Sequence, residues 1–345
     1  MLEKKGEIGY DGNQNPCMHI DKGDSAMGNI ASENERLPAR HGQAPRLAAA
    51  LRLHWQLYVM LIIPIGFVIV FHYMVYPNLR IAFMDFRPAM SWDSPWVGFD
   101  TFRRIFADAD FYRALRNTLM INVIDVFVQF PAPVILALML NELRMRKFKR
   151  VSQTILHMPH FLSAVIVASV AYAMFRPQTG LANILLMEWG WIDTGIPFLT
   201  EPVNWVITYL TINIWQNMGW GTIIYLAAMT AIDPRLYEAA TADGAGRLKQ
   251  IWHVTLPGIK PVIVVLFIMR LGHILGGTFD RLNAFGNVSA REYQYQLPIY
   301  IYEKGLMAGR FSMATAVGLF QTLVALFMVL IADRIVKKLG DDGLI

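Results

Sequence analysis

The chain has one cysteine, few charged residues and no phosphate-binding loop, and each shortage excludes a class of protein. Cys17 cannot form an internal disulfide and lacks the second Cys or clustered His of a metal site. No GxxxxGK[ST] motif occurs, so the chain has no such loop for the phosphates of ATP. Only 17% of the 345 residues are charged and 55% are hydrophobic, which is too apolar for a soluble domain. We therefore expect a membrane protein.

The formal net charge of +5 could indicate nucleic-acid binding. However, Lys and Arg gather beside the apolar runs, with no Arg-rich tract and no aromatic surface for bases. We expect no nucleic acid among the partners.

Long apolar runs dominate the chain. They are long enough to cross a hydrocarbon core of about 30 Å as helices, and they stay apolar throughout, whereas membrane strands alternate. The six candidate spans lie at 55–76, 117–140, 154–175, 203–230, 261–279 and 312–333. These runs predict an all-α, polytopic membrane protein with six transmembrane helices.

Polar segments flank this membrane domain, which we place at 54–338. Residues 1–53 are rich in Gly, Asn, Asp, Glu and Lys and cannot bury enough apolar surface to offset their ordering entropy. We expect a largely mobile tail there, and a short C-terminal tail at 339–345.

The distribution of Lys and Arg predicts the orientation. An even number of spans leaves both ends on one side, and the positive-inside rule assigns the side richer in Lys and Arg to the cytoplasm. That side holds both termini and the loops 141–153 and 231–260. The outer loops carry Trp189 and Trp191, which we interpret as anchors at the membrane interface, with a sugar-stacking platform as the alternative.

The loop 231–260 contains helix signals of its own. Asp233 can cap a helix whose first residue is Pro234, and Gly244 can end it. A second short helix is expected over 247–254, ended by Leu256-Pro257 before the fifth span. This pattern predicts a helix, a sharp turn and a second helix.

Within this loop, the stretch EAATADGAGRLKQIWHVTLP at 238–257 resembles the loop signature of binding-protein-dependent ABC importer permeases. That signature is EAA, three residues, G, nine residues, I or V, and then LP; the apolar position is Val254 here and not an Ile, a mild departure. The segments 97–119 and 311–338 are similar to the carbohydrate-uptake branch, and 278–306 is similar to the subgroup that handles polymeric sugars, including alginate. The resemblance extends over about residues 55–338.

The resemblance implies that the first loop helix docks into a cleft on a cytoplasmic ATPase. The residues implied in this coupling are Glu238, Ala239, Ala240, Asp243, Gly244, Leu256 and Pro257. Small Ala side chains permit close approach, and Gly permits a turn that is unfavourable for residues with a Cβ. The alternative is an amphipathic surface helix with a good C-cap.

The same resemblance implies the assembly and its place. A second, related but different permease, two cytoplasmic ATPase subunits and an extracytoplasmic substrate-binding protein are expected, with a sugar as cargo. ATP with Mg is expected on the ATPase subunits. This chain is expected to bind no cofactor or metal, to contain no catalytic residue and to span a bacterial inner membrane several times, with both ends cytoplasmic.

Polar residues inside apolar spans indicate a transport path, because they are costly in lipid. The candidates are Asn213, Gln216, Asn217, Trp220 and Arg270. Contacts between helices are an equally good explanation of the residues in the fourth span. For Arg270 we favour a structural ion pair with Asp125 over the carboxylate of an acidic sugar. Gln129, Pro131 and Pro133 indicate a break in the second span.

Two other functions compete with transport by a permease. Asp108-Ala109-Asp110 is similar to the metal-binding DxD of glycosyltransferases and prompts a membrane enzyme of polysaccharide synthesis, although this triplet falls in an outer loop. The other alternative is a secondary transporter driven by ions, which would not need the loop 231–260.

Overall fold

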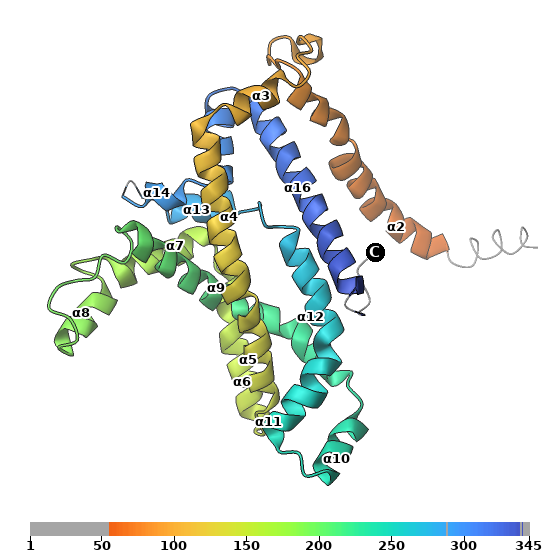
Figure 1. Cartoon of the computed structure of the whole chain (residues 1–345), viewed down its shortest axis with the longest axis vertical. Helices are drawn as coiled ribbons and strands as arrows, with labels where there is room; N and C mark the ends of the chain where they lie inside the picture. Colours follow the sequence, from red (N-terminus) through yellow and green to blue (C-terminus); the bar gives the residue numbers. More distant parts are fainter. Residues whose placement is uncertain (1–54, 288, 339, 341–345) are drawn as a thin grey trace, which may run out of the picture. The chain divides into compact units, whose positions relative to one another are not determined.

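The computed structural model describes residues 55–287, 289–338 and 340, and the regular structure in these ranges is helical (Figure 1). The described residues contain no strand, only an isolated antiparallel bridge between Met84 and Trp96. The predicted all-α class is confirmed. The tail predicted at 1–53 lies outside the described residues, as does the segment 339–345 apart from Gly340.

The chain divides into two compact units, Met1–Val68 and Ile69–Ile345. The described part of the first unit is the helix α2 (Trp55–Val68), which has an apolar sequence and contains no buried residue. Its large side chains are exposed, among them Met60 and Ile63 at 72% and 78%. A helix that is apolar on all sides and exposed fits a lipid environment.

The second unit begins with short helical segments and continues with helices of four to 29 residues. The short segments are η1 (Ile69–Tyr73), η2 (Tyr76–Phe83) and η3 (Ser91–Asp93). The elements that follow are α3 (Asp100–Phe106), α4 (Ala109–Gln129), α5 (Pro131–Asn141), α6 (Arg146–His157), η4 (Met158–Phe161), α7 (Ala164–Phe175), α8 (Leu181–Glu188), α9 (Pro202–Thr230), α10 (Pro234–Ala242), α11 (Arg247–Gln250), η5 (Ile251–Thr255), α12 (Leu256–Leu271), α13 (Phe279–Ala284), α14 (Arg291–Gln294), α15 (Leu297–Tyr300), η6 (Ile301–Met307) and α16 (Phe311–Lys338).

Four helical runs of the described chain are long and apolar enough to cross a membrane: Trp55–Phe83, Ala109–Asn141, Arg247–Leu271 and Phe311–Lys338. A fifth is counted if α6 with η4 and α7 form one broken span, because these two parts are bent by 103°. The 29-residue α9 is long enough to cross a membrane, but it is less apolar than these runs because its middle carries amide side chains. The count of six spans therefore stays a prediction.

Two predicted spans have the wrong shape. The run at 154–175 is not one helix: Pro159 lies in η4, and Ser163 then caps α7 by accepting the backbone N–H of Ile166. The run at 261–279 is wrong at both ends, because the helix starts with α11 and stops at Leu271. Gly272 is the C-cap there, and further glycines follow at 276 and 277.

The break predicted in the second span is present, although it is mild. α4 ends at Gln129 and α5 begins at Pro131, with Phe130 between them. Pro131 takes the first position of α5, where its missing N–H costs least. The two helices together are still long and apolar enough to form a single span, Ala109–Asn141.

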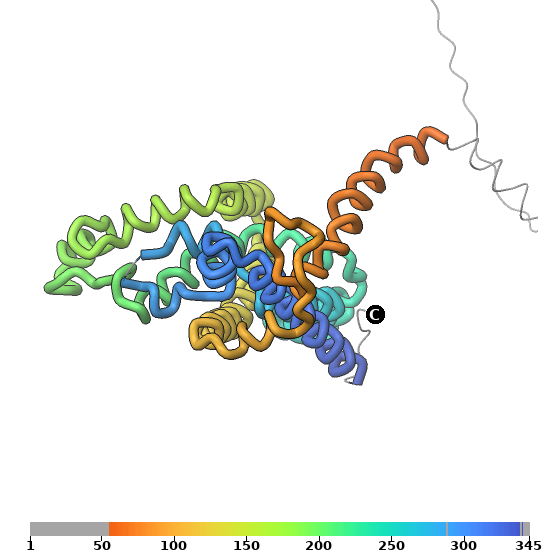
Figure 2. Tube along the Cα trace, turned by 90° about the horizontal axis from the view of Figure 1, so that it is seen from above, coloured from red at the N-terminus to blue at the C-terminus, as the bar shows by residue number. Residues whose placement is uncertain are grey.

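The buried core of the second unit has two parts. The larger one joins α4, α9, α13, α15 and α16 around Phe111, Trp205 and Tyr300, and Trp205 Nε1 donates to the carbonyl oxygen of Phe285 at 2.9 Å. The smaller one packs α5 against α9 and α12. Seen from above, α7 and α8 extend to one side of this unit, away from α12 and α16 (Figure 2).

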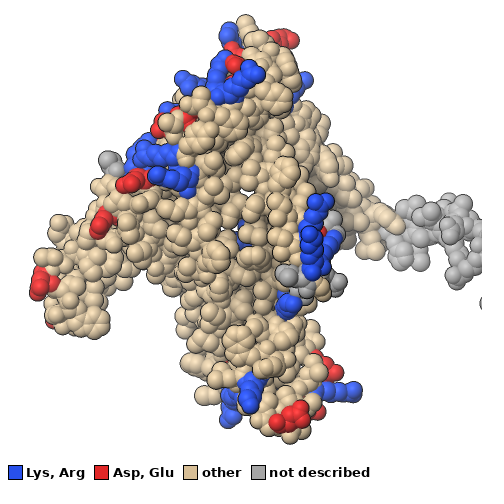
Figure 3. Space-filling view, viewed as in Figure 1, with Lys and Arg blue, Asp and Glu red and all other residues tan. Residues whose placement is uncertain are grey.

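Charged side chains are unevenly distributed over the second unit. In the space-filling view they gather around α10 and α11, around α3, α14 and the start of α4, and at the C-terminal end of α16, and few are seen over the rest of α4 and over α5 (Figure 3). Many apolar residues between those regions are exposed, for example Phe127, Ile135 and Met139 at 74%, 56% and 64%. Such a band suits the hydrocarbon core of a bilayer.

Candidate coupling helix and polar cavity

The predicted cap of the loop helix is present. The carboxylate of Asp233 accepts the backbone N–H of Arg235 at 2.9 Å, and Pro234 is the first residue of α10. The helix ends at Ala242, and Gly244 adopts a left-handed φ of +74°. The N–H of Ala245 then donates to the carbonyl of Ala240 at 2.8 Å, which closes the C-terminus.

α10 is an exposed element held by few contacts. It contains no buried residue, and the candidate residues Glu238, Ala239, Asp243 and Gly244 are exposed, while Ala240 is half-buried. The hydroxyls of Tyr237 and Thr255 lie 2.9 Å apart and connect α10 to η5. This geometry leaves one face of α10 free for another protein.

Large apolar side chains beside α10 strengthen this view of the loop as a docking surface. Leu236, Leu248 and Trp252 are 54%, 74% and 65% exposed. Gln250 steadies the turn, because its amide Nε2 donates to Thr241 Oγ1 and to the carbonyl of Ala245, both at 3.0 Å.

The expected end of the second loop helix at Leu256-Pro257 is wrong. Leu256 begins α12, and the helix continues through Pro257 into the long apolar run. The π-helical turn η5 ends at Thr255, two residues before this proline, so the change of hydrogen-bond register occurs next to a residue that cannot donate. Leu256 and Pro257 therefore belong to the start of a continuous helix, where Leu256 is half-buried and Pro257 exposed.

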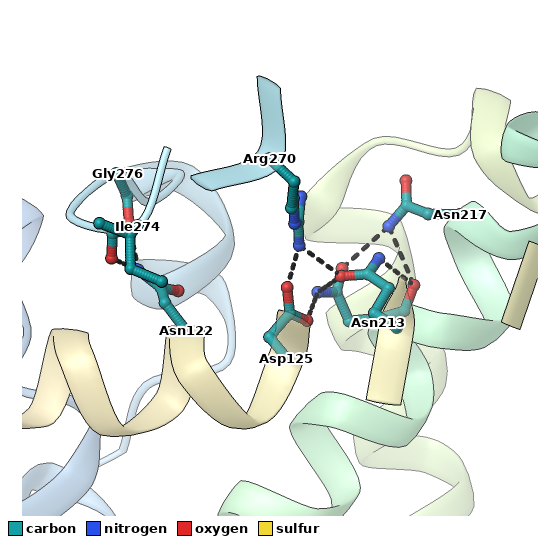
Figure 4. Close-up of polar contacts among 8 residues, drawn as sticks. Asn122, Asp125, Asn213, Asn217, Arg270, Ile274 and Gly276 are labelled. Atoms are coloured by element: carbon teal, nitrogen blue, oxygen red, sulfur yellow. Dashed lines mark hydrogen bonds and ion pairs between the residues drawn. The ribbon is translucent and has the colours of Figure 1, made fainter. Parts of the chain in front are cut away.

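A polar cluster joins α4, α9 and α12 inside the second unit (Figure 4). The predicted ion pair is present: the guanidinium of Arg270 contacts Asp125 Oδ2 and also donates to Gln129 Oε1 at 2.8 Å. The amide Nδ2 of Asn213 donates to Asp125 Oδ1 and Gln129 Oε1, at 3.2 and 3.1 Å. The side chain of Asp125 is only 7% exposed, so its charge depends on these partners.

The other predicted path residues on α9 extend this network outward. Asn217 Nδ2 donates to both oxygens of Asn213, and its Oδ1 lies 3.2 Å from His160 Nδ1. The exposed Trp220 stacks on the ring of His160 with 4.7 Å between centroids. Gln216 Nε2 donates to the carbonyl of Leu162 at 2.9 Å.

A polar cavity of about 270 Å³ lies beside the cluster. Asn213 and Arg270 line it, whereas the other path candidates Gln216, Asn217 and Trp220 do not. Its wall also includes Asn122, whose Nδ2 donates at 2.8 Å to the carbonyls of Ile274 and Gly276 (Figure 4). The structure thus divides the predicted path residues into two that line the cavity and three that do not.

Two parts of this site are not predicted from the sequence: the roles of Asn122 and Gln129 on α4, and that of Arg281 on α13. Only the residues on α4 have a pattern that could have indicated them. Asn122, Asp125 and Gln129 are spaced i, i+3 and i+7, which places all three on one helical face. Gln129, expected only to mark a break in the second span, is also a member of the polar cluster. Arg281 also lines the cavity, and no local pattern indicates this, because it comes from the separate helix α13.

The DxD-like triplet has structural partners. Asp108 caps α4 by accepting the N–H of Asp110, and it accepts the hydroxyl of Tyr300 at 3.0 Å. Asp110 pairs with Lys304 at 2.8 Å, and the hydrogen bond to Asp110 raises the pKa of Lys304. Residues 55–287, 289–338 and 340 hold no group of three or more His, Cys, Asp or Glu side chains that could bind a metal.

An exposed capped helix between two long helices, together with a polar cavity walled by α4, α9 and α12, defines a membrane transport subunit. The chain belongs to the family described as binding-protein-dependent transport system inner membrane component, which matches residues 129–341. This confirms the resemblance seen in the loop sequence.

Two proteins of similar sequence match this chain over most of their length. One is the Polygalacturonan/rhamnogalacturonan transport system permease protein YteP of Bacillus subtilis (strain 168), 41% identical over 300 residues, which are 87% of this chain and 93% of YteP. Another is Protein LplB of the same organism, 41% identical over 302 residues, which are 86% of this chain and 93% of LplB.

Solved structures include a similar chain. The crystal structure of a bacterial ABC transporter involved in the import of the acidic polysaccharide alginate contains a chain 38% identical, with a TM-score of 0.76, covering 85% of this chain and 99% of that one. The crystal structure of the bacterial alginate ABC transporter in complex with an alginate pentasaccharide-bound periplasmic protein contains a chain 37% identical, with a TM-score of 0.76. The match covers 87% of this chain and 100% of that one.

Proposed function

We propose that this chain is the transmembrane permease subunit of an ATP-driven ABC importer that moves an oligo- or polysaccharide, acidic in character, into the cytoplasm. The observation that carries this proposal is the likeness over nearly the whole chain to YteP and to the alginate transporter chain, both named for acidic polysaccharides. The polar cavity supports it, because sugar hydroxyls and carboxylates need amide and guanidinium partners.

The loop helix α10 is the element of this chain that docks on the ATPase. Its exposed face combines Glu238 with small alanines, and the flanking Leu236 and Trp252 are apolar and exposed, which suits insertion into a cleft. Closure of the ATPase pair would then move α10 and, through Thr255 and α12, the wall of the cavity.

The assembly contains this chain, a second and related permease, two cytoplasmic ATPase subunits and an extracytoplasmic binding protein. ATP with Mg is held by the ATPase subunits. The chain lies in a bacterial inner membrane with both ends and α10 in the cytoplasm, as the basic residues of α6 and of the α10 loop support. The alginate transporter in complex with its loaded periplasmic protein supports the place of the binding protein.

The proposed function is tested by uptake in the native bacterium. Deleting the gene should abolish uptake of short oligogalacturonides or alginate oligosaccharides, and the wild-type gene should restore it. Glu238→Lys should not restore uptake and should lose co-purification with the ATPase subunits, because it reverses the charge on the docking face.

Glu188→Lys is the matched control for that experiment. It makes the same charge reversal on the exposed end of α8, so the ATPase subunits should still co-purify. Normal uptake of both sugars by the deletion strain would contradict the proposed function. Normal ATP-driven uptake by Glu238→Lys would contradict the docking role alone.

A further inference from the structure

The charges around the polar cavity do not balance. Of the described residues that line it, Arg270 and Arg281 are cations and Asp125 is the carboxylate. The cavity therefore has an excess of one positive charge, before any contribution from His273. An unbalanced cation within a membrane domain normally faces a water-filled path or its substrate.

Arg270 does not supply this excess. Its guanidinium is engaged by the Asp125 carboxylate and by Gln129 Oε1. Asn213 contacts the same two acceptors, so the pair is built into a network that holds both partners in place. A carboxylate from outside would have to displace Asp125 to bind Arg270, leaving Asp125 buried without its cation.

Arg281 is the cation left over. Its Nη2 donates to the neutral Gln216 Oε1 at 3.1 Å, and its Nε is buried without a hydrogen-bond partner. None of the ion pairs formed between described residues includes Arg281. A guanidinium has five N–H donors in a planar fork, and four of them are on its two terminal nitrogens, so donors remain there for a bidentate acceptor besides the one given to Gln216.

We propose that Arg281 is the residue that selects acidic sugars in the cavity, by binding the carboxylate of one uronate unit. This inference rests on the proposed function and names the group that recognises the substrate. A carboxylate has the geometry of the guanidinium fork and supplies the negative charge that the cavity lacks. The cavity volume of about 270 Å³ is near the lower limit of small-molecule sites, which is about 300 Å³. The cavity therefore holds a few sugar rings of the polysaccharide at a time at most.

The neighbours of Arg281 fit the passage of a sugar. Gln216 orients the guanidinium, and Gln216 is in turn held by the carbonyl of Leu162. The Nδ2 of Asn122 is engaged by two carbonyls, so its Oδ1, which accepts no hydrogen bond from a described residue, is the group on the cavity wall that can accept from a sugar hydroxyl. The amide of Asn213 is held by Asp125, Gln129 and Asn217 and keeps the wall in place. Asp125 keeps Arg270 neutralised, so a single cation faces the cargo.

The test compares Arg281→Gln and Arg281→Lys in the complete importer, reconstituted in liposomes with its binding protein and a short oligogalacturonide. Both sugar uptake and ATP hydrolysis are measured, because a role in selection changes the sugar moved per ATP, whereas a role in folding or docking lowers both together. Arg281→Gln should hydrolyse ATP normally but move about tenfold less sugar per ATP, the loss expected for a charge-assisted hydrogen bond. Arg281→Lys should keep most of the transport.

Arg103→Gln on α3 is the matched control, since it removes an exposed Arg distant in sequence from the cavity and should leave the ratio unchanged. Unchanged sugar per ATP in Arg281→Gln would overturn the inference, and so would an equal fall of uptake and hydrolysis in both Arg281 variants. If the wild-type importer moves neither oligogalacturonide nor alginate oligosaccharide, the proposed function fails, and the inference fails with it.

Discussion

The ion pair between Asp125 and Arg270 gives the sharpest test of the structure. Asp125→Asn keeps the shape of the side chain and an oxygen that can accept from Asn213, but it removes the charge that faces Arg270. Breaking a buried pair by removing one partner costs about 3–5 kcal/mol. Here Arg270 is 39% exposed and keeps its bond to Gln129, so we expect a loss of only about 2–3 kcal/mol.

The loss should appear in the thermal stability of the purified protein without any sugar. A change of this size corresponds to a fall in the apparent Tm of about 5 °C for a domain of a few hundred residues. The assay is the fraction of protein that remains monodisperse on size-exclusion chromatography after heating at a fixed rate, because membrane proteins often unfold irreversibly. Asp193→Asn, an exposed carboxylate after α8, is the control and should not change the Tm.

A double variant separates the pair from its surroundings. Asp125→Asn combined with Arg270→Gln removes both charges, so the double variant should be more stable than the sum of the two single losses predicts. Strictly additive losses would refute a direct pair, and an unchanged Tm in Asp125→Asn would refute the claim that Asp125 is held charged by Arg270.

Two glycine predictions concern backbone geometry. Gly244→Ala should weaken coupling, with less ATPase co-purified, because it places a Cβ at a φ of +74° at a cost of about 1 kcal/mol; Gly246→Ala, at a φ of −67° and with open space around its Cβ, should behave as wild type. Gly219→Ala should lower the Tm, because its Cβ would lie 1.9 Å from the carbonyl oxygen of Leu156 and overpacking costs about 1–3 kcal/mol. Gly318→Ala in α16 meets nothing within 4 Å and should leave the Tm unchanged or raise it. Equal behaviour of the two variants in either comparison would contradict the corresponding geometry.

The local signals of the sequence predicted the local structure well. The cap at Asp233, the proline at 234 and the stop at Gly244 define α10 because each acts through its own backbone and its near neighbours. The pair of Asp125 and Arg270 was also predictable, since two opposite charges inside apolar runs have few other ways to be satisfied.

Tertiary structure decided the rest. Gln129 and Asn122 needed the positions of α9, α12 and the turn after it before their partners were known, and Arg281 reaches the cavity from a helix that no span contains. The bend of 103° between α6 and α7 likewise could not be found in an apolar run, because hydropathy records how apolar a segment is and not its direction. The sequence by itself determined the apolar spans, the capped helix α10 and the family signature, because each depends on residues close together in the chain. Contacts between distant segments decided which polar groups meet and which cation is left without a carboxylate.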